Sequence, residues 1–337
     1  MPTNREHIEK WSLGYHLLKA YTVFCYKIYY RTTIVGLENI PYKKNLIFAA
    51  NHQNSLNDAH CIHCITKGQT VFLARSDIFK KSTVNKILTY FKILPVYRIR
   101  DGYSNLQLND DVFRKTLDVI KNHNGIGILP EGNHFGQRRL RPLKKGIARI
   151  AFQAEDACNN ELKIQIIPVG LNYGHYINFR SKLLIRVGKP IDVSKYLELY
   201  RQNPALAYNA LIEELEIAMK AEMIQITHED YYDEYEMLRD LFTPPYIKSK
   251  KLPAGHNGHF EVDKRMIAAL DNLRVEDQSQ FEGLMGETKM VSTIIADNKL
   301  TARSVNASNF KLWGLLIKLP ILFAALPLFI ADRKSVV

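Results

Sequence analysis

The stretch Leu46-Ile-Phe-Ala-Ala-Asn-His-Gln-Asn-Ser-Leu-Asn-Asp58 places a polar cluster directly after a short apolar run. An uninterrupted apolar run such as Leu46 to Ala50 predicts a buried strand. In open α/β sheets, the carboxyl ends of the strands present loops to a ligand. We therefore expect an α/β domain with a candidate site that begins at Asn51.

Strand-like and helix-like segments alternate around this stretch. Residues 110–122 and 145–155 repeat apolar side chains at spacings of three and four, which is typical of amphipathic helices that cover a sheet. The pattern predicts a central, mostly parallel sheet covered by helices. Short apolar runs predict five more strands, at residues 71–74, 93–97, 125–129, 165–171 and 183–187.

The strands stop after Pro190, and a helical C-terminal region follows. Residues 204–226 and 260–298 are predicted to be long helices. An acidic, tyrosine-rich stretch, the pair Pro244-Pro245 and a turn region from Pro253 to Gly258 are expected to separate them. We place a domain boundary near Ser249.

Two stretches have the composition of segments that meet lipid. Residues 11–30 are mostly apolar and aromatic, as at the headgroup level of a bilayer, although a core helix fits equally well. Two lysines and a histidine argue against a full crossing. Residues 312–330 are apolar over a length that could span a membrane, with a buried hairpin as the alternative. The predicted parts are an amphipathic membrane-associating region, an α/β domain, a helical extension and an apolar membrane segment, at residues 1–40, 41–248, 249–308 and 309–337.

Positive charge is concentrated in the first half of the chain. Residues 1–150 hold 24 basic and 10 acidic side chains, or +14, whereas residues 151–337 hold 22 and 24, or −2. A positive field suits nucleic acid, an anionic membrane surface or a phosphorylated substrate. No helix-turn-helix, zinc or aromatic RNA-binding signature accompanies it, so we expect no nucleic-acid partner.

The composition excludes several classes of protein. With 46% hydrophobic and 24% charged residues, the 337-residue chain is globular rather than disordered or collagen-like. Four cysteines are too few and too scattered for a disulfide scaffold. Cys61-Ile-His-Cys64 has the spacing of half a zinc site, but no second pair completes it, so helix packing explains these cysteines better.

His52 and Asp58 are a candidate general-base pair. A nearby carboxylate fixes the tautomer of a histidine ring and stabilises the imidazolium. The two residues are six apart, so on a regular helix they would be rotated by about 240° and would face different sides. They converge only across a turn. The alternative is a histidine satisfied by local backbone groups.

A second polar cluster, Leu129-Pro-Glu-Gly-Asn-His134, follows the predicted strand at 125–129. Gly132 allows the backbone to approach a ligand closely, and arginine and lysine side chains suit phosphate oxygens. A solvated helix face is the alternative for Arg139 and Arg149. The candidate ligands in the basic run that follows are Arg138, Arg141 and Lys144. Elsewhere Arg98 ends a strand-like run, with a surface arginine as the alternative.

Four segments, taken in order, resemble the glycerolipid acyltransferase family that includes 1-acylglycerol-3-phosphate acyltransferases. The family blocks read Asn-His-x-x-x-x-Asp, Pro-Val-x-Arg, Phe-Pro-Glu-Gly-Thr-Arg and Ile-Pro-Val. The corresponding positions here are His52, Arg98, Glu131 with Gly132, and Pro168. The resemblance covers about residues 45–191, under half of the chain.

Two differences from the family pattern change the expected site. The family's aspartate would fall at position 57, where this chain has Asn57, so we expect Asp58 to serve from a loop one residue longer. Asn133-His134 stand where the family has Thr-Arg. We expect Arg138, Arg139 or Arg141 to supply the missing cation.

The resemblance implies direct acyl transfer from acyl-coenzyme A or acyl carrier protein to the hydroxyl of lysophosphatidic acid, giving phosphatidic acid. It implies no covalent acyl-enzyme, no metal and no bound cofactor. His52 would remove the hydroxyl proton, and Asp58 would stabilise the imidazolium. Arg98, Glu131 and Gly132 would position the acceptor, with Glu131 ordering a basic group or a glycerol hydroxyl rather than phosphate.

The same resemblance implies a membrane-associated enzyme with its catalytic domain on the cytoplasmic side, because the acceptor is a membrane lipid and the thioester is soluble. Two alternatives remain at this point. One is an acyltransferase for a lyso-aminolipid or for glycerol 3-phosphate. The other is a catalytically inactive membrane scaffold.

Overall fold

The computed structural model describes residues 7–97 and 108–305, which divide into two compact units. The first unit extends to Gly136 and resumes over Leu140–Met223. The second comprises Gln137–Arg139 together with the chain from Ile224 onward. The change of unit therefore comes earlier than the expected boundary, because Ser249 ends helix α9 (Tyr232–Ser249) inside the second unit.

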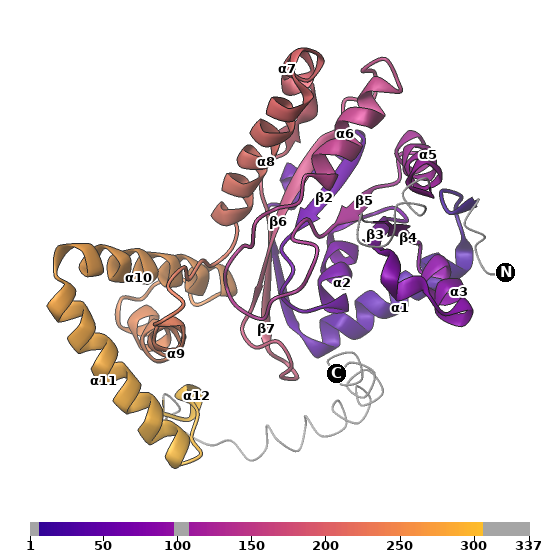
Figure 1. Ribbon diagram of the computed structural model, residues 1–337. Helices are drawn as coiled ribbons and strands as arrows, with labels where there is room; N and C mark the ends of the chain where they lie inside the picture. Colours follow the sequence, from indigo (N-terminus) through magenta and orange to yellow (C-terminus); the bar gives the residue numbers. More distant parts are fainter. Residues whose placement is uncertain (1–6, 98–107, 306–337) are drawn as a thin grey trace. The chain divides into compact units, whose positions relative to one another are not determined.

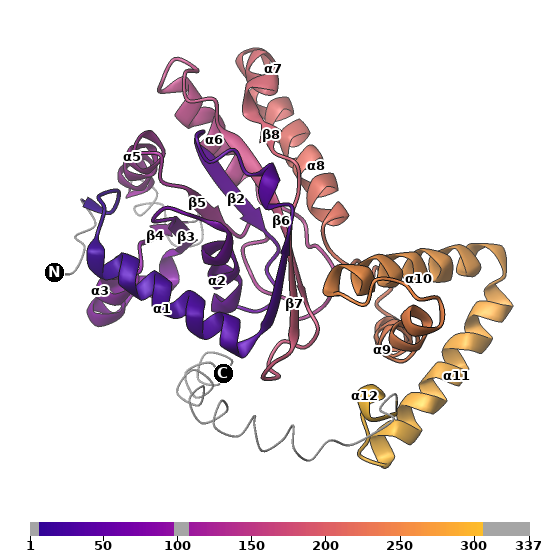
Figure 2. The same cartoon turned by 180° about the vertical axis from the view of Figure 1, so that it is seen from behind.

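An eight-stranded sheet forms the centre of the first unit (Figures 1 and 2). Its order is β1-β7-β6-β2-β5-β3-β4, and β8 pairs with β6. Five adjacent strands, from β6 to β4, run parallel, while β7 and β1 run in the opposite direction. The strands are β1 (Arg31–Val35), β2 (Leu46–Ala50), β3 (Val71–Arg75), β4 (Ile93–Val96), β5 (Ile126–Ile128), β6 (Gln165–Tyr173), β7 (Lys182–Val187) and β8 (Ile191–Asp192).

The structure confirms the mostly parallel sheet, and all six predicted strands are present. Two further strands, β1 and β8, escaped the apolar pattern. β1 lies at the edge of the sheet and reads Arg-Thr-Thr-Ile-Val, with its residues partly or fully exposed, so it offers no continuous apolar run. β8 has only two residues.

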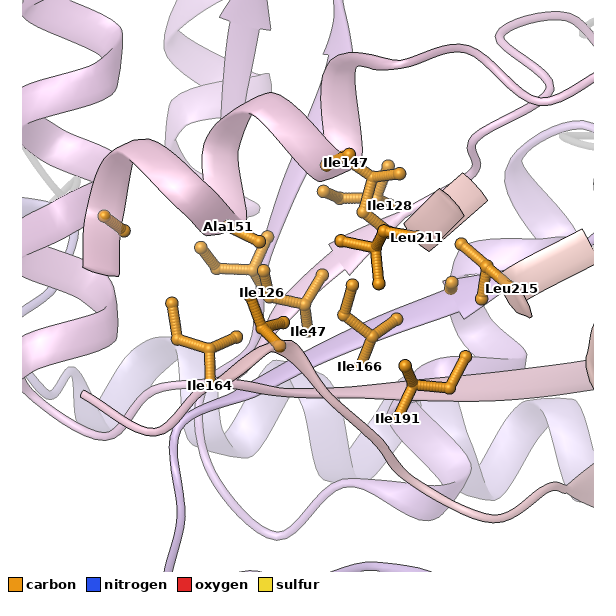
Figure 3. Packing of buried hydrophobic residues seen from close by; sticks show 14 of the residues in the cluster. Ile47, Ile126, Ile128, Ile147, Ala151, Ile164, Ile166, Ile191, Leu211 and Leu215 are labelled. Atoms are coloured by element: carbon orange, nitrogen blue, oxygen red, sulfur yellow. The ribbon is translucent and has the colours of Figure 1, made fainter. Parts of the chain in front are cut away.

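Helices cover both faces of this sheet. On one face, Ile47 of β2 and Ile166 of β6 pack against Ile147 of α6 and Leu211 of α8 (Figure 3). Full burial of each such side chain contributes roughly 1.5–3 kcal/mol. Helices α1 and α2 lie on the opposite face (Figures 1 and 2). The helices of this unit are α1 (Leu13–Tyr29), α2 (Leu56–Ile65), α3 (Ser82–Tyr90), α5 (Leu108–Lys121), α6 (Gly146–Asp156), α7 (Leu197–Gln202) and α8 (Pro204–Ala221).

Helix α1 has two contrasting faces. On the inner face Lys19 is buried, and its ammonium donates to the Thr66 and Gly68 carbonyls at 2.8 and 2.7 Å. Burial lowers the pKa of Lys19 to about 8. Apolar side chains that are 57–66% exposed lie along the outer face and just before the helix: Trp11, Leu13, Leu17, Tyr21 and Phe24. The helix therefore packs on the core along one side and presents an apolar stripe along the other.

The second unit consists of α9, α10 (His256–Glu276), α11 (Gln278–Asp297) and α12 (Ala302–Val305) in the described residues. We expected Pro244-Pro245 to break the helical pattern, and this expectation is wrong because α9 continues through both prolines. Each proline removes one backbone donor. Buried Thr243 donates to the carboxylate of Asp263 on α10 at 2.6 Å, and such packing holds the helix together despite the loss.

Within the described part of the chain, no helix combines the length and the apolar character needed to cross a membrane. The predicted membrane segment at 312–330 lies outside the described residues.

Candidate active site

The structure brings His52 and Asp58 together at the carboxyl end of β2. The ring Nδ1 of His52 lies 2.8 Å from Oδ2 of Asp58, whose side chain is fully buried, whereas the His52 side chain is 15% exposed. A carboxylate only accepts hydrogen bonds, so Nδ1 of the neutral ring carries the proton and Nε2 is the acceptor. This arrangement suits a general base at the protein surface.

A turn solves the spacing problem between the two residues. Asp58 lies in the first turn of α2, and Ser55 before that helix has φ 50° and ψ −130°, a conformation that side chains rarely adopt. The carboxylate of Asp58 accepts the N–H groups of Gln53 and Asn54 at 2.9 and 2.8 Å. The backbone of the loop therefore folds around the Asp58 carboxylate. This turn brings His52 and Asp58 together, as their spacing in the sequence requires.

Asn51 ties the start of this loop to the neighbouring strand. Its side-chain oxygen accepts the Leu171 N–H at 2.6 Å, and its amide nitrogen donates to the Leu171 carbonyl at 3.1 Å. The fully buried amide thus takes the place of a peptide group in the ladder with β6. Asn51 therefore anchors the backbone immediately before His52.

Glu131 holds the backbone of two loops. Its carboxylate accepts the N–H of His52 at 2.7 Å and the N–H of Arg141 at 3.0 Å. Burial raises the pKa of Glu131, and these two N–H bonds oppose that effect. We expected this residue to order a basic group or a substrate hydroxyl. In the structure each of its oxygens accepts a backbone N–H group, and one of these belongs to the basic residue Arg141.

Gly132 follows Glu131 with φ +77°, a conformation that glycine adopts without strain. Its N–H donates to the Leu129 carbonyl at 3.1 Å, and the Phe135 N–H donates to the His52 carbonyl at 3.0 Å. The first bond closes the turn after β5, and the second joins the loop after β5 to the loop after β2. The exposed His134 ring lies 5.6 Å from the His52 ring, edge to face.

Sequence reasoning missed one cation of this site. Arg75 is the last residue of β3, and its guanidinium makes two 3.2 Å contacts with Asp77 and donates to the side-chain oxygen of Asn133. Arg75 is 41% exposed and lies beside the residue that precedes His134. An arginine after a strand is a useful signal only within a recognised motif, as at Arg98, and Arg75 stands in none of the four family blocks. Only the sheet order, with β3 next to β5, brings it to this loop.

Of the other basic residues predicted to bind phosphate, two lie near the loop after β5 and one cannot be placed. Half-buried Arg141 stacks over the ring of Phe135 at 5.7 Å, and exposed Lys144 lies close to Gly132. Arg98 lies outside the described residues.

Arg138 is placed differently from what we expected. It is buried in the second unit, where its guanidinium pairs with Glu236 at 2.7 Å, and its neighbour Arg139 pairs with Glu229. Arg138 was expected to contact phosphate and Arg139 was one candidate for the missing cation, but both side chains are used in ion pairs with α9 or the loop before it.

The cysteines of α2 do not form a metal site with other described residues, among which no group of three or more His, Cys, Asp or Glu side chains is arranged to hold an ion. Cys61 is fully buried, and burial raises the pKa of its thiol well above the usual value. Its thiol contacts the hydroxyl groups of Tyr26 and Tyr173 at 3.1 and 3.2 Å.

Comparisons with known proteins identify relatives of the region that holds this site. Residues 31–172 match the family model described as acyltransferase. The chain is 28% identical over 166 residues to glycerol-3-phosphate O-acyltransferase 1 of Saccharomyces cerevisiae. This aligned region covers 48% of this chain and 21% of the yeast protein. It is 27% identical over 191 residues to a 1-acyl-sn-glycerol-3-phosphate acyltransferase of Borreliella burgdorferi, covering 54% of this chain and 71% of that protein.

Among solved structures, the 1-acyl-sn-glycerophosphate acyltransferase of Thermotoga maritima matches 60% of this chain and 81% of its own, with 20% identity and a TM-score of 0.39. The matched region spans about a fifth of the length of the yeast relative. Residues 31–172 of this chain are an acyltransferase domain, related to those of glycerol-3-phosphate and 1-acyl-sn-glycerol-3-phosphate acyltransferases.

Proposed function

We propose that this protein transfers a fatty acyl group from acyl-coenzyme A or acyl carrier protein to the hydroxyl of lysophosphatidic acid, giving phosphatidic acid. The observation that carries the proposal is the His52–Asp58 pair at the carboxyl end of β2, with Nε2 of His52 left as the acceptor. The Borreliella relative named above supports the choice of acceptor.

In the proposed reaction, Nε2 of His52 takes the proton of the acceptor hydroxyl as its oxygen attacks the thioester carbon. The tetrahedral intermediate collapses, the C–S bond breaks, and the imidazolium returns the proton to the leaving thiolate. An ester and a free thiol are the products. Asp58 stabilises the imidazolium throughout, so the reaction needs no covalent acyl-enzyme.

The acceptor phosphate binds at the cations beside His52. Arg75 and Arg141 offer guanidinium groups, and Lys144 offers an ammonium on the same loop as Gly132. Charge-assisted hydrogen bonds to phosphate oxygens are among the stronger polar contacts in proteins. Arg98 remains a predicted ligand from the sequence.

The enzyme reaches its lipid acceptor by lying on the membrane along α1. Aromatic and aliphatic side chains of its outer face, which are more than half exposed, suit the headgroup boundary of a bilayer. The charge of +14 in residues 1–150 favours an anionic leaflet. We place the catalytic domain on the cytoplasmic side, where the soluble thioester donor is supplied.

Glycerol 3-phosphate is the second candidate acceptor. The Saccharomyces cerevisiae relatives at 28% and 32% identity both carry the name glycerol-3-phosphate O-acyltransferase. This acceptor would use the same base and the same cations, because it also presents a hydroxyl near a phosphate. It differs in lacking an acyl chain.

The test is transfer of radiolabelled acyl groups by the purified full-length chain from each donor to lysophosphatidic acid, glycerol 3-phosphate or a lyso-aminolipid. His52→Ala is the loss-of-function variant. His123→Ala is the matched control, because His123 contacts Asn45 at the amino end of β2 and its removal leaves the opposite end intact.

Phosphatidic acid formed by wild type and His123→Ala, and lost at least a hundredfold in folded His52→Ala, supports the proposal. Product from glycerol 3-phosphate alone moves the acceptor and keeps the base. Absence of transfer with every pair, from protein that still binds vesicles, overturns the catalytic proposal in favour of a scaffold.

A further inference from the structure

A buried tyrosine occupies the remaining oxygen of the Asp58 carboxylate. Tyr173, the last residue of β6, is 1% exposed and donates its hydroxyl to Oδ1 of Asp58 at 2.9 Å. The other oxygen, Oδ2, receives the His52 ring and the N–H groups of Gln53 and Asn54. Tyr173 is thus the side-chain donor on the face of Asp58 that is turned away from His52.

Tyr173 is itself held by two partners. Its hydroxyl lies 3.1 Å from the hydroxyl of Tyr26 on α1 and 3.2 Å from Sγ of Cys61 on α2, and these two groups lie 3.1 Å apart. The single hydroxyl proton of Tyr173 goes to Asp58. Tyr26 and Cys61 have one proton each, so two of the three contacts are made at once, and in every consistent assignment the oxygen of Tyr173 receives at least one donor.

These three groups stay neutral. Burial raises the pKa of Tyr173 well above its usual value, and the adjacent Asp58 charge raises it further. Burial also raises the pKa values of Tyr26 and Cys61. Cys61 is therefore a hydrogen-bonding group rather than a nucleophile, since the thiolate is the reactive form.

We propose that Tyr173, held by Tyr26 and Cys61, is a positioning residue for the Asp58 carboxylate and sets how strongly Asp58 supports the His52 base. The inference rests on the proposed function for its effect on turnover, but the geometry concerns the protein alone. The hydroxyl directs its positive end at Asp58, which weakens the pull of the carboxylate on the imidazolium. Removal of this hydroxyl makes the imidazolium easier to form.

The test compares Tyr173→Phe, Tyr26→Phe and Tyr15→Phe in the full-length chain. Tyr15 is the matched control, because it is also buried on α1 but its hydroxyl donates to the Thr70 carbonyl at 3.2 Å. The first readout is the NMR titration of the His52 ring, which needs no substrate. We expect its midpoint to move to higher pH by about 0.3–1 unit in Tyr173→Phe, by less in Tyr26→Phe, and not at all in Tyr15→Phe.

The second readout is the pH profile of acyl transfer. In Tyr173→Phe we expect the acid limb of the profile to move to higher pH with the ring titration, so that kcat falls about twofold to tenfold on that limb, where more of the ring is protonated. On the plateau at higher pH we expect kcat not to fall, and KM for the acceptor to stay within about twofold of wild type. A ring titration identical to wild type in folded Tyr173→Phe overturns the inference, whatever the turnover. If wild type transfers no acyl group, the proposed function fails while the ring titration still decides the role of Tyr173.

Discussion

The carboxylate of Glu131 accepts the backbone N–H of His52 at 2.7 Å, so an acidic side chain from the loop after β5 holds the histidine at the end of β2. The second oxygen accepts the N–H of Arg141. One buried side chain thereby joins the two loops that frame the site, and its charge acts on the protein rather than on the phosphate of a substrate.

Replacing Glu131 with Gln is expected to lower the free energy of unfolding by about 1–3 kcal/mol, because the new amide group faces one of the two backbone donors and leaves it unsatisfied. We also expect kcat to fall, since the backbone of His52 loses its anchor. Urea unfolding and turnover at saturating acceptor measure the two effects. Glu161→Gln alters an exposed glutamate and should behave as wild type, and a Glu131→Gln variant as stable as this control would contradict the role assigned to Glu131.

Exchanging the residues at 57 and 58 tests the longer loop. The double variant Asn57→Asp with Asp58→Asn should be as inactive as Asp58→Asn alone, with a loss of about 10²–10⁴ in kcat. The donors from Gln53, Asn54 and Tyr173 converge on position 58, whereas Asn57 reaches the side chain of Asn54. Recovery of turnover in the double variant would show that position 57 can serve the histidine.

Arg75→Ala is expected to raise KM for lysophosphatidic acid about tenfold with little change in kcat, because a phosphate contact of this kind is worth roughly 1.4 kcal/mol. The same substitution should leave transfer to a monoacylglycerol unchanged, since that acceptor has no phosphate. Arg149→Ala on the exposed face of α6 is the control for loss of one positive charge. Equal effects on both acceptors would remove Arg75 from the phosphate site.

The outer face of α1 should bind membranes. The double variant Leu17→Glu with Phe24→Glu is expected to weaken binding to anionic vesicles more than about tenfold. The two apolar side chains that would be buried in the bilayer are replaced by negatively charged ones. Flotation of vesicles with the purified chain measures the effect. Ile217→Glu changes an equally exposed apolar residue on α8 and should bind as wild type. Similar losses in both variants would point to general hydrophobicity instead of α1.

Stability should depend on pH through His60 on α2. Burial lowers the pKa of His60 to about 4, below the unfolded value of roughly 6.5, so between these values the unfolded chain binds the extra proton. The contribution of His60 to stability is complete above pH 6.5 and is lost as the pH falls toward 4, by about 2 kcal/mol at pH 5. Urea unfolding at pH 7 and pH 5 should show a smaller difference for His60→Gln than for wild type. Equal differences would mean that the fold does not keep the His60 ring neutral at pH 5.

Much of the fold follows from patterns that are local in the sequence. Apolar runs marked the buried strands, and polar residues after β2 and β5 marked the edge of the sheet where the site lies. The His52–Asp58 pair needed only one further condition, a turn between the two residues, and Ser55 provides it. The helical extension was predicted as helices but not its start, because the prolines of α9 are compensated by packing against α10.

The residues that sequence reasoning missed depend on contacts between distant segments. Arg75 reaches Asn133 because β3 is adjacent to β5, and Tyr173 reaches Asp58 because β6 is adjacent to β2. The basic side chain of Arg138 and its position in a basic run suggested a phosphate ligand. It instead pairs with Glu236, which is 98 positions away in the sequence. Composition identifies a cation, but only the tertiary structure tells what the cation is paired with.

The short segment Gln137–Arg139 has a consequence for how this protein can be divided. It belongs to the second unit. There the carbonyl of Arg138 accepts the N–H of Ile226, and the N–H of Arg138 donates to the hydroxyl of Tyr232. Yet the same segment lies in the loop between Glu131 and Arg141, the two positions joined by a hydrogen bond at the site. The two units therefore cannot be separated by a single cut. Cutting the chain after Met223 would remove the backbone and guanidinium partners of Arg138, which lies in the middle of the loop at the candidate site.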